Sequence, residues 1–349
     1  MQNQDFPASF LKKGAKKLFR VILYFGFLCV TVLLLLEACY RLYIFDFYGG
    51  NFKGLNPNEL TYSKDSDPKV LALGDSFTAD PLGYVGHLRD SLLNTRVFNA
   101  AVPGTTIKQS GLMARKRFRK VDPGVVIYQV YVGNDLFEYK HRTKGSSIST
   151  IRKVYWWLSD RLWVIGYINA KMPAIRQTVA NTSPVEFDPK TLADYDPATY
   201  SRRVKLQFQT EPRLISNSVF LSGKREKDFE AYAKKVKDLT DKVDTGKNIL
   251  IVVIPHCAQV SAQYQSNMEK IGAKFEEQLN HQQIIYPFLE RLSAKLERPG
   301  LSMINTLPVL QKAERISPVF YGNDPHLNSF GQTIIGNEVI DRLRELGYN

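Results

Sequence analysis

Short apolar runs alternate with amphipathic stretches along most of this chain. Apolar runs of strand type lie at residues 69–73, 96–102, 124–132, 248–255 and within 301–310. In the intervening stretches apolar residues recur at helical spacing, at 83–94, 105–120, 224–243, much of 260–297, and 329–346. Strands that alternate with helices are typical of a parallel sheet with helices on both faces. The pattern predicts an α/β fold whose ligands bind at the carboxyl ends of the strands.

One long segment, residues 136–222, interrupts the alternation. It contains all three tryptophans of the chain, Trp156, Trp157 and Trp163, and a polar stretch near 181–198. Two interpretations stand side by side. The segment is either a lid or substrate-binding cap that also touches a membrane surface, or an insertion with a small core of its own.

The most apolar part of the chain lies near its N-terminus. Residues 21–36, VILYFGFLCVTVLLLL, form an almost unbroken apolar run, and twenty residues separate Arg20 from Arg41. As a helix rising about 1.5 Å per residue, these twenty residues span roughly 30 Å, the thickness of a bilayer core. We therefore expect residues 21–45 to be a transmembrane signal anchor. Basic residues within segment 1–20 predict a cytoplasmic N-terminus, and the rest of the chain is expected in the periplasm or outside the cell.

Two other kinds of leader fit this segment less well. A cleaved signal peptide has a shorter apolar core and a small-residue cleavage site. A lipoprotein signal has no acid before its cysteine, whereas Glu37 precedes Cys39 here. Because a charge at mid-bilayer costs about 2.5–3.5 kcal/mol, we expect Glu37 to pair with Arg41, four residues on, at the membrane edge.

Composition narrows the functional classes. The 349 residues carry a formal net charge of +13, concentrated at 12–20, 108–120 and 224–242. These basic residues are not interleaved with stacking aromatics, so we expect no nucleic-acid partner. Three cysteines and five histidines have no disulfide-framework or zinc-ligand spacing, so we expect no metal and no organic cofactor.

The chain therefore divides into four predicted parts. Residues 1–20 are the cytoplasmic N-terminus and 21–45 the membrane anchor. Residues 46–68, rich in Gly, Asn, Pro and Ser, are predicted to be a linker. Residues 69–349 are the predicted catalytic domain, with the cap insertion at about 136–222.

Candidate chemistry appears at both ends of this domain. The apolar run from Val70 ends abruptly in Gly74-Asp75-Ser76, and a serine on a Gly-permitted turn after a strand can stand exposed as a nucleophile. Near the C-terminus, Asp324 and His326 supply a carboxylate and a base. Ser before Asp before His is one order in which a serine triad is assembled.

Four short blocks give the chain a resemblance to the SGNH (GDSL-type) hydrolase family. They are GDSFT at 74–78, NAAVPGTT at 99–106, YVGND at 131–135 and DPHLN at 324–328. The resemblance covers roughly residues 69–346 and implies a three-layer αβα, flavodoxin-like fold. Each block alone is a weak signal, but four in order are specific.

The resemblance also implies a role for each matched residue. Ser76 would be the nucleophile, His326 the base, and Asp324 the carboxylate that orients the imidazole. The backbone N–H groups of Ser76 and Gly104 and the side-chain amide of Asn134 would form the oxyanion hole.

Two positions depart from the family pattern. Only Pro325 separates Asp324 from His326, where two residues are usual, and Asn323 occupies the more usual aspartate position. In the third block Val132 stands where glycine is expected.

The sequence thus predicts a membrane-anchored serine esterase that cleaves acyl esters, O-acetyl esters included, through an acyl-serine. The expected substrate is an acylated small molecule or polysaccharide. One alternative is an O-acyltransferase that passes the acyl group to a cell-envelope polysaccharide. A second alternative is a catalytically silent envelope-binding protein.

Overall fold

A computed structural model describes residues 8–60, 67–180, 194–275, 279 and 283–349. Its centre is a parallel sheet of five strands in the order β2-β1-β3-β4-β5. The strands are β1 (Lys69–Leu73), β2 (Arg96–Asn99), β3 (Val125–Tyr131), β4 (Asn248–Ile254) and β5 (Leu301–Asn305). In register, β3 and β4 pair from Val125 with Asn248 to Tyr131 with Ile254. Every residue of β3 is buried, as expected for a central strand covered on both faces.

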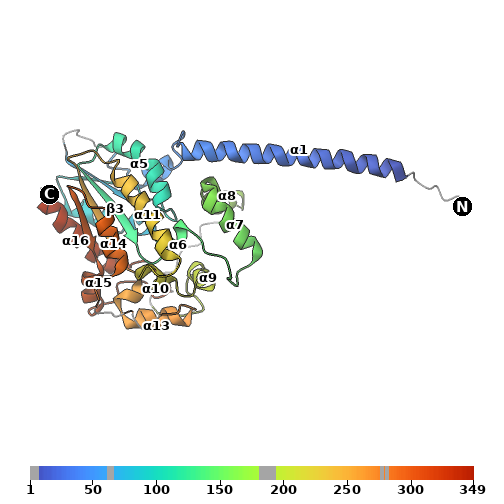
Figure 1. Ribbon diagram of the computed structural model, residues 1–349. Helices are drawn as coiled ribbons and strands as arrows, with labels where there is room; N and C mark the ends of the chain where they lie inside the picture. Colours follow the sequence, from blue (N-terminus) through green and yellow to red (C-terminus); the bar gives the residue numbers. More distant parts are fainter. Residues whose placement is uncertain (1–7, 61–66, 181–193, 276–278, 280–282) are drawn as a thin grey trace.

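Helices cover both faces of the sheet (Figure 1). The chain steps from β1 to β2 in one direction and from β2 to β3 in the other, so right-handed crossovers put the two connecting helices on opposite faces. One layer contains α4 (Tyr84–Ser91), α15 (Leu307–Glu314) and α16 (Ser329–Glu345). The other contains α5 (Ile107–Val121), α11 (Arg225–Thr240) and α14 (Pro287–Lys295). The expected three-layer fold with flavodoxin-like strand order is confirmed.

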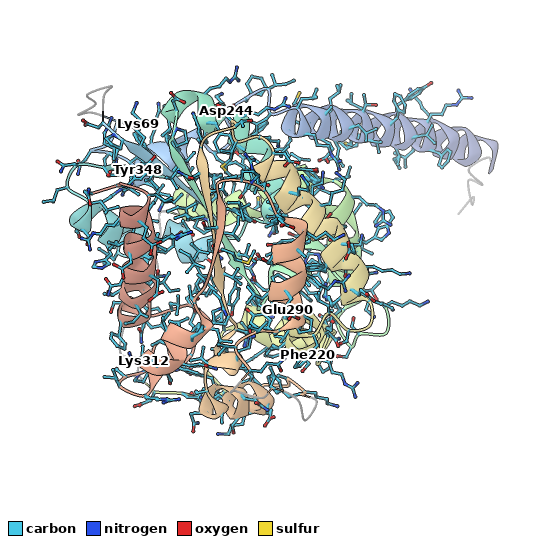
Figure 2. All side chains as sticks on the ribbon, turned by 60° about the vertical axis from the view of Figure 1, so that its left-hand side comes forward. Lys69, Phe220, Asp244, Glu290, Lys312 and Tyr348 are labelled. Atoms are coloured by element: carbon cyan, nitrogen blue, oxygen red, sulfur yellow. The ribbon has the colours of Figure 1, made fainter. Side chains whose placement is uncertain are left out.

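The two ends of the sheet differ in role. Figure 2 shows Lys69, Asp244 and Tyr348 at one end of the domain and Phe220 and Lys312 toward the other. Lys69 opens β1 and Asp244 lies just before β4, so the first end carries the amino ends of the strands. The opposite end carries the strand carboxyl ends and the short helices α3 (Ser76–Ala79), α6 (Asp135–Tyr139), α12 (Cys257–Val260) and α13 (Ala262–Lys270).

The apolar N-terminal segment forms α1 (Ala8–Arg41), which projects from the domain as a long single helix (Figure 1). Its stretch Lys17–Arg41 is long and apolar enough to cross a membrane. Tyr43 has a positive φ of 50°, and the N–H of Ile44 bonds back to the carbonyl of Cys39. This left-handed cap ends the helix. The helix therefore stops four residues before the predicted boundary at 45.

The long helix α1 is attached to the domain by Glu37. Arg41 Nε donates to Glu37 Oε1 at 2.5 Å, which is the expected ion pair. The same carboxylate also accepts the backbone N–H groups of Trp163 (3.0 Å) and Val164 (2.9 Å). These N–H groups open α8 (Trp163–Ala180). Since the first N–H groups of a helix have no partner within it, Glu37 caps α8 and joins it to α1.

Aromatic side chains extend this junction. Tyr40 and Tyr48 are buried and their hydroxyls lie 2.5 Å apart, while Phe47 and Tyr40 pack on Tyr167 of α8 with ring centroids 5.4–5.5 Å apart. Most of these aromatics thus pack within the protein, although their sequence position also suits a bilayer interface.

The described part of the predicted linker, residues 46–60, packs as part of the domain. It forms α2 (Gly49–Leu55), whose Phe52 is buried and stacks on Phe98. Asn56 is fully buried and holds the backbone of Asn99 through bonds of 2.7 Å to both its N–H and its carbonyl. The Gly, Asn and Pro content reflects tight turns and a buried amide contact here; residues 61–66 lie outside the described residues.

The cap segment consists of α6, α7 (Thr150–Arg161), α8, α9 (Arg202–Thr210) and α10 (Leu214–Val219) in its described part. Its buried side chains Trp156, Val164 and Phe208 belong to the same apolar cluster as the strands of the sheet. The described part therefore has no separate core. Most of the predicted polar stretch, at 181–193, lies outside the described residues.

Candidate active site

Ser76 stands immediately after β1, at the first turn of α3. Asp75 precedes it as the helix N-cap, and its carboxylate accepts the N–H of Phe77 at 3.0 Å. A Cβ on Gly74 would come within 2.5 Å of Thr78 Oγ1 and 2.7 Å of Gln129 Oε1. Only glycine fits this turn, which delivers Ser76 to the carboxyl edge of the sheet.

His326 reaches Ser76 from the far end of the chain. Ser76 Oγ and His326 Nε2 lie 2.6 Å apart, and His326 Nδ1 is hydrogen-bonded to Asp324 Oδ1. The same carboxylate oxygen accepts the backbone N–H of His326 at 2.9 Å. Hydrogen bonds therefore connect the serine hydroxyl, the imidazole and the carboxylate in series, the arrangement required for proton transfer from the hydroxyl.

A tight loop before α16 holds the acid and the base. Phe320 and Leu327 form an antiparallel bridge, and the N–H of Tyr321 bonds to the carbonyl of His326 at 3.1 Å. Asn328 caps α16 through the N–H of Gly331 at 2.9 Å. Phe77 packs against the imidazole with ring centroids 4.8 Å apart. The His326 ring is thus fixed by backbone pairing on one side and by an aromatic ring on the other.

The surroundings of His326 and Asp324 favour the imidazolium and the carboxylate over their neutral forms. Burial acts to lower the pKa of His326, but the hydrogen bond and charge of Asp324 outweigh it, so the pKa of His326 rises above its ordinary value of 6.5. Burial acts to raise the pKa of Asp324. The hydrogen bond from His326 and the charge of His326 outweigh burial, so the pKa of Asp324 is lowered. An imidazolium formed when Ser76 loses its proton is therefore stabilised.

Asn323, at the position where the family pattern more often has aspartate, has a different set of partners. Its side chain is buried, its Nδ2 donates to the carbonyl of Asp194 at 2.5 Å, and its Oδ1 accepts the N–H of Asp196 at 2.6 Å. Asn323 thus fixes the chain that leads into α9 of the cap, while Asp324 is the carboxylate bonded to the imidazole.

The predicted oxyanion donors line the same small cavity as the triad, a space of about 50 Å³. Gly104 has φ +69°, a conformation that favours glycine. Asn134 follows β3 as the N-cap of α6, and its Oδ1 is buried with no hydrogen-bond partner in the described residues. Gly133 is required beside it, because a Cβ there would come within 2.4 Å of the Tyr131 ring and 2.6 Å of the His256 ring. The predicted site residues, Ser76, Gly104, Asn134, Asp324 and His326, therefore meet around one cavity.

His256 also lines this cavity. Burial lowers its pKa to about 3, so the ring is neutral. Its Nδ1 accepts the N–H of Ala258 at 3.0 Å, which leaves the proton on Nε2. His256 thus lines the cavity and also caps α12.

Asp135, in contrast, is structural. It accepts the hydroxyl of Tyr232 at 2.7 Å and the N–H of Tyr131 at 3.1 Å, and burial raises its pKa. Within the described ranges, no cluster of three or more His, Cys, Asp or Glu side chains suits a metal ion.

The sequence did not indicate Arg203 and Glu138. Arg203 Nη2 lies 3.0 Å from Glu138 Oε1, and both side chains line the catalytic cavity. Arg203 comes from α9 of the cap and matches no motif block, so no pattern in the sequence could have placed it in the wall of the cavity that Ser76 lines.

No family model and no curated protein matches this chain. Solved structures to which it is similar include TesA, at 11% identity over 80% of this chain and 99% of that chain, with a TM-score of 0.37. Another is a lipolytic G-D-S-L family protein from Veillonella parvula, at 11% identity over 78% and 96%, with a TM-score of 0.39. A third is the Axe2 acetylxylan esterase of Geobacillus stearothermophilus, in a catalytic mutant, at 12% over 82% and 97%, with a TM-score of 0.40.

The second of these neighbours is named a lipolytic G-D-S-L family protein and the third an acetylxylan esterase, and the four sequence blocks resemble that hydrolase class. At such identities and TM-scores the likeness carries no argument about activity, substrate or catalytic residues. The function is therefore argued from this chain's own site.

Proposed function

We propose that this protein is a membrane-anchored serine esterase of the SGNH type. One observation carries the proposal: a serine hydroxyl 2.6 Å from an imidazole that is itself bonded to a carboxylate, all on a cavity shared with Gly104 and Asn134. Few structural roles need a nucleophile, a base and candidate oxyanion donors at one edge of a sheet.

The geometry supports a two-step reaction. His326 Nε2 takes the proton of Ser76 as Oγ attacks the ester carbonyl, and Asp324 stabilises the imidazolium. The N–H groups of Ser76 and Gly104 and the amide of Asn134 stabilise the oxyanion. Collapse of the intermediate expels the alcohol, which receives the proton from His326 and leaves an acyl-serine. Water, deprotonated by the same imidazole, then releases the acid and restores Ser76.

Anchoring by α1 supports an extracytoplasmic location. Within the span Lys17–Arg41, the most apolar window of 18 residues has a mean hydropathy of 2.4, and none of that window is buried by the domain. Basic residues precede the span, so we propose a cytoplasmic N-terminus and a catalytic domain on the outer face of the cell membrane. Capping of α8 by Glu37 then holds the site at a fixed distance from the bilayer.

Acyl transfer is the second candidate. It is favoured by α9, which supplies Arg203, Val204 and Gln207 to the wall of the catalytic cavity. A site that restricts water leaves an acyl-serine time to react with a bound sugar hydroxyl. Products decide between the two: free acid indicates hydrolysis, whereas an added acyl mass on the sugar indicates transfer.

The proposal is tested by labelling the full-length protein with a fluorophosphonate and mapping the modified residue. We expect a single adduct on Ser76, and none after Ser76→Ala. Labelling retained in Ser293→Ala, an exposed serine on α14, provides the matched control. A folded protein that takes up no label would favour the catalytically silent alternative.

A further inference from the structure

A second and larger cavity, of about 540 Å³, lies beside the catalytic one, between the sheet domain and the cap. The two cavities share Gly104, Thr105, Glu138, Arg203 and Gln207 in their walls. Arg203 stands at the junction, since its Nη1 lies 3.9 Å from where a Cβ on Gly104 would be. A molecule in the larger cavity could therefore extend one group to Ser76. The volume is that of a small-molecule site.

The charges around the larger cavity are unbalanced. Its cationic residues are Lys108, Arg152, Arg202 and Arg203, and its carboxylates are Glu138 and Asp160. Glu138 is paired with Arg203, and Asp160 with His141 at 2.7 Å and with Lys140 at 3.4 Å. Both carboxylates thus have partners.

Three cations remain without a carboxylate within the described part of the chain: Lys108, Arg152 and Arg202. Lys108 Nζ is held by the carbonyl of Tyr139 at 2.7 Å, while Arg152 and Arg202 are exposed. A cavity edged by the exposed guanidinium groups of Arg152 and Arg202 attracts an anion, and guanidinium binds carboxylate or phosphate through paired hydrogen bonds.

The rest of the wall points to a sugar. Aromatic rings line the cavity, namely Tyr48, Phe137, Tyr155, Trp156, Trp163 and Tyr167. Its wall also contains Thr105, Thr106, Gln109, Ser159 and Asn169, whose side chains can form hydrogen bonds. Among the described residues, Leu206 is the one large aliphatic side chain in this wall. A fatty acyl chain would need several such side chains, so the wall does not suit one. Flat rings with polar edges suit a ligand that has both apolar and hydroxylated faces.

We infer that the larger cavity binds a glycan segment bearing acidic sugar units, which form the alcohol side of the ester at Ser76. The inference rests on the proposed function for its link to Ser76, but the binding itself does not need catalysis. In hydrolysis this glycan is the leaving alcohol, and in transfer it is the acyl acceptor. The cation-edged cavity holds the chain while one hydroxyl or its ester reaches the catalytic serine.

The test is a binding titration by calorimetry, using full-length Ser76→Ala protein in nanodiscs of neutral lipid. The probes are tetragalacturonate, a phosphorylated maltotetraose, and neutral maltotetraose of the same length. At least one charged tetrasaccharide should bind about tenfold more tightly than the neutral one, with an affinity that falls as salt rises. Equal affinity of all three, or no binding of any, would overturn the inference.

A matched pair of variants locates the site. Arg152→Gln together with Arg202→Gln is expected to abolish most of the preference, a loss of about tenfold for the charged probe. Lys234→Gln, an exposed lysine on α11, should leave binding unchanged. Thermal unfolding of each variant checks that it is folded. An unaltered preference in the folded double variant would also overturn the inference.

Lipid is tested as the competing ligand. Nanodiscs containing phosphatidylglycerol should leave the affinity for the charged tetrasaccharide within about twofold. Competition that tracks the lipid content, and disappears in the double arginine variant, would assign the cavity to a lipid headgroup instead. Fluorophosphonate labelling of wild-type protein separates the two hypotheses: failure to label contradicts the esterase, whereas loss of the charge preference contradicts only the glycan.

Discussion

The two neighbouring cavities are built on opposite principles. In the catalytic cavity each reactive group is already paired: Ser76 with His326, and His326 with Asp324. In the larger cavity Arg152 and Arg202 have no carboxylate partner among the residues described, and they are exposed. Catalysis is faster when the reacting groups are already in position. Preorganised dipoles then stabilise the transition state at no cost in reorganisation. Recognition benefits from charges that remain unsatisfied until a ligand arrives.

Removal of the nucleophile is the experiment that best distinguishes the functions of the two cavities. Ser76→Ala should lower hydrolysis of p-nitrophenyl acetate by about 10⁴-fold or more, because no other group in the line can form the acyl intermediate. Binding of the charged tetrasaccharide should persist, since the larger cavity is untouched. Circular dichroism confirms the fold. Residual turnover near the wild-type rate would reject Ser76 as the nucleophile.

A second test uses the adjacent pair Asp324 and Asn323. Asp324→Asn should reduce kcat by about 10³–10⁴-fold, because the imidazole loses its orienting carboxylate. In wild-type protein, kcat/KM should rise with pH and reach half its plateau above 6.5, since protonated His326 cannot accept the serine proton and Asp324 raises its pKa. Asp324→Asn should move this half-point to lower pH.

Asn323→Ala is the control for that experiment. Its side chain binds the backbone of Asp194 and Asp196 in the cap, so it should loosen the cap and leave the half-point of the pH profile in place. If Asn323→Ala shifts the profile and Asp324→Asn does not, the carboxylate has been misassigned.

The oxyanion site predicts a smaller effect. Asn134→Ala should lower kcat by about 10²–10³-fold with little change in KM, because the amide acts on the oxyanion and not on the ground state. Steady-state kinetics on the same small ester measures both constants. If KM instead rises by the same factor and kcat is unchanged, Asn134 binds the ground state of the substrate.

The smallest expected effect concerns the junction between α1 and the cap. Glu37→Ala leaves the N–H groups of Trp163 and Val164 without their capping carboxylate, at a cost of about 1 kcal/mol. Hydrogen exchange should become faster in the first turn of α8, and binding in the larger cavity should weaken. Glu290→Ala, an exposed glutamate on α14, is the control and should leave exchange in α8 unchanged.

Prediction from the sequence succeeded where a physical rule acts along the chain. Alternation of apolar runs predicted the sheet, because a strand covered on both faces has to be apolar. The Gly74-Asp75-Ser76 turn and the Asp324-Pro325-His326 loop carried their own local signals. The same reasoning predicted a linker at residues 46–68, because the burial of Phe52 and Asn56, in its described part, depends on partners far away in the sequence.

The sequence by itself determined the α/β layers, the apolar N-terminal helix and the identity of the residues that now line one catalytic cavity. Those properties follow from local hydrophobic pattern, chain length and motif. Tertiary structure alone decided that Asn323 binds the backbone of Asp194 and Asp196 in the cap. It alone also placed Arg203 beside Gly104 and made Glu37 the cap of α8. Contacts between residues about a hundred or more positions apart depend on how the layers pack, and no short window of sequence encodes that packing.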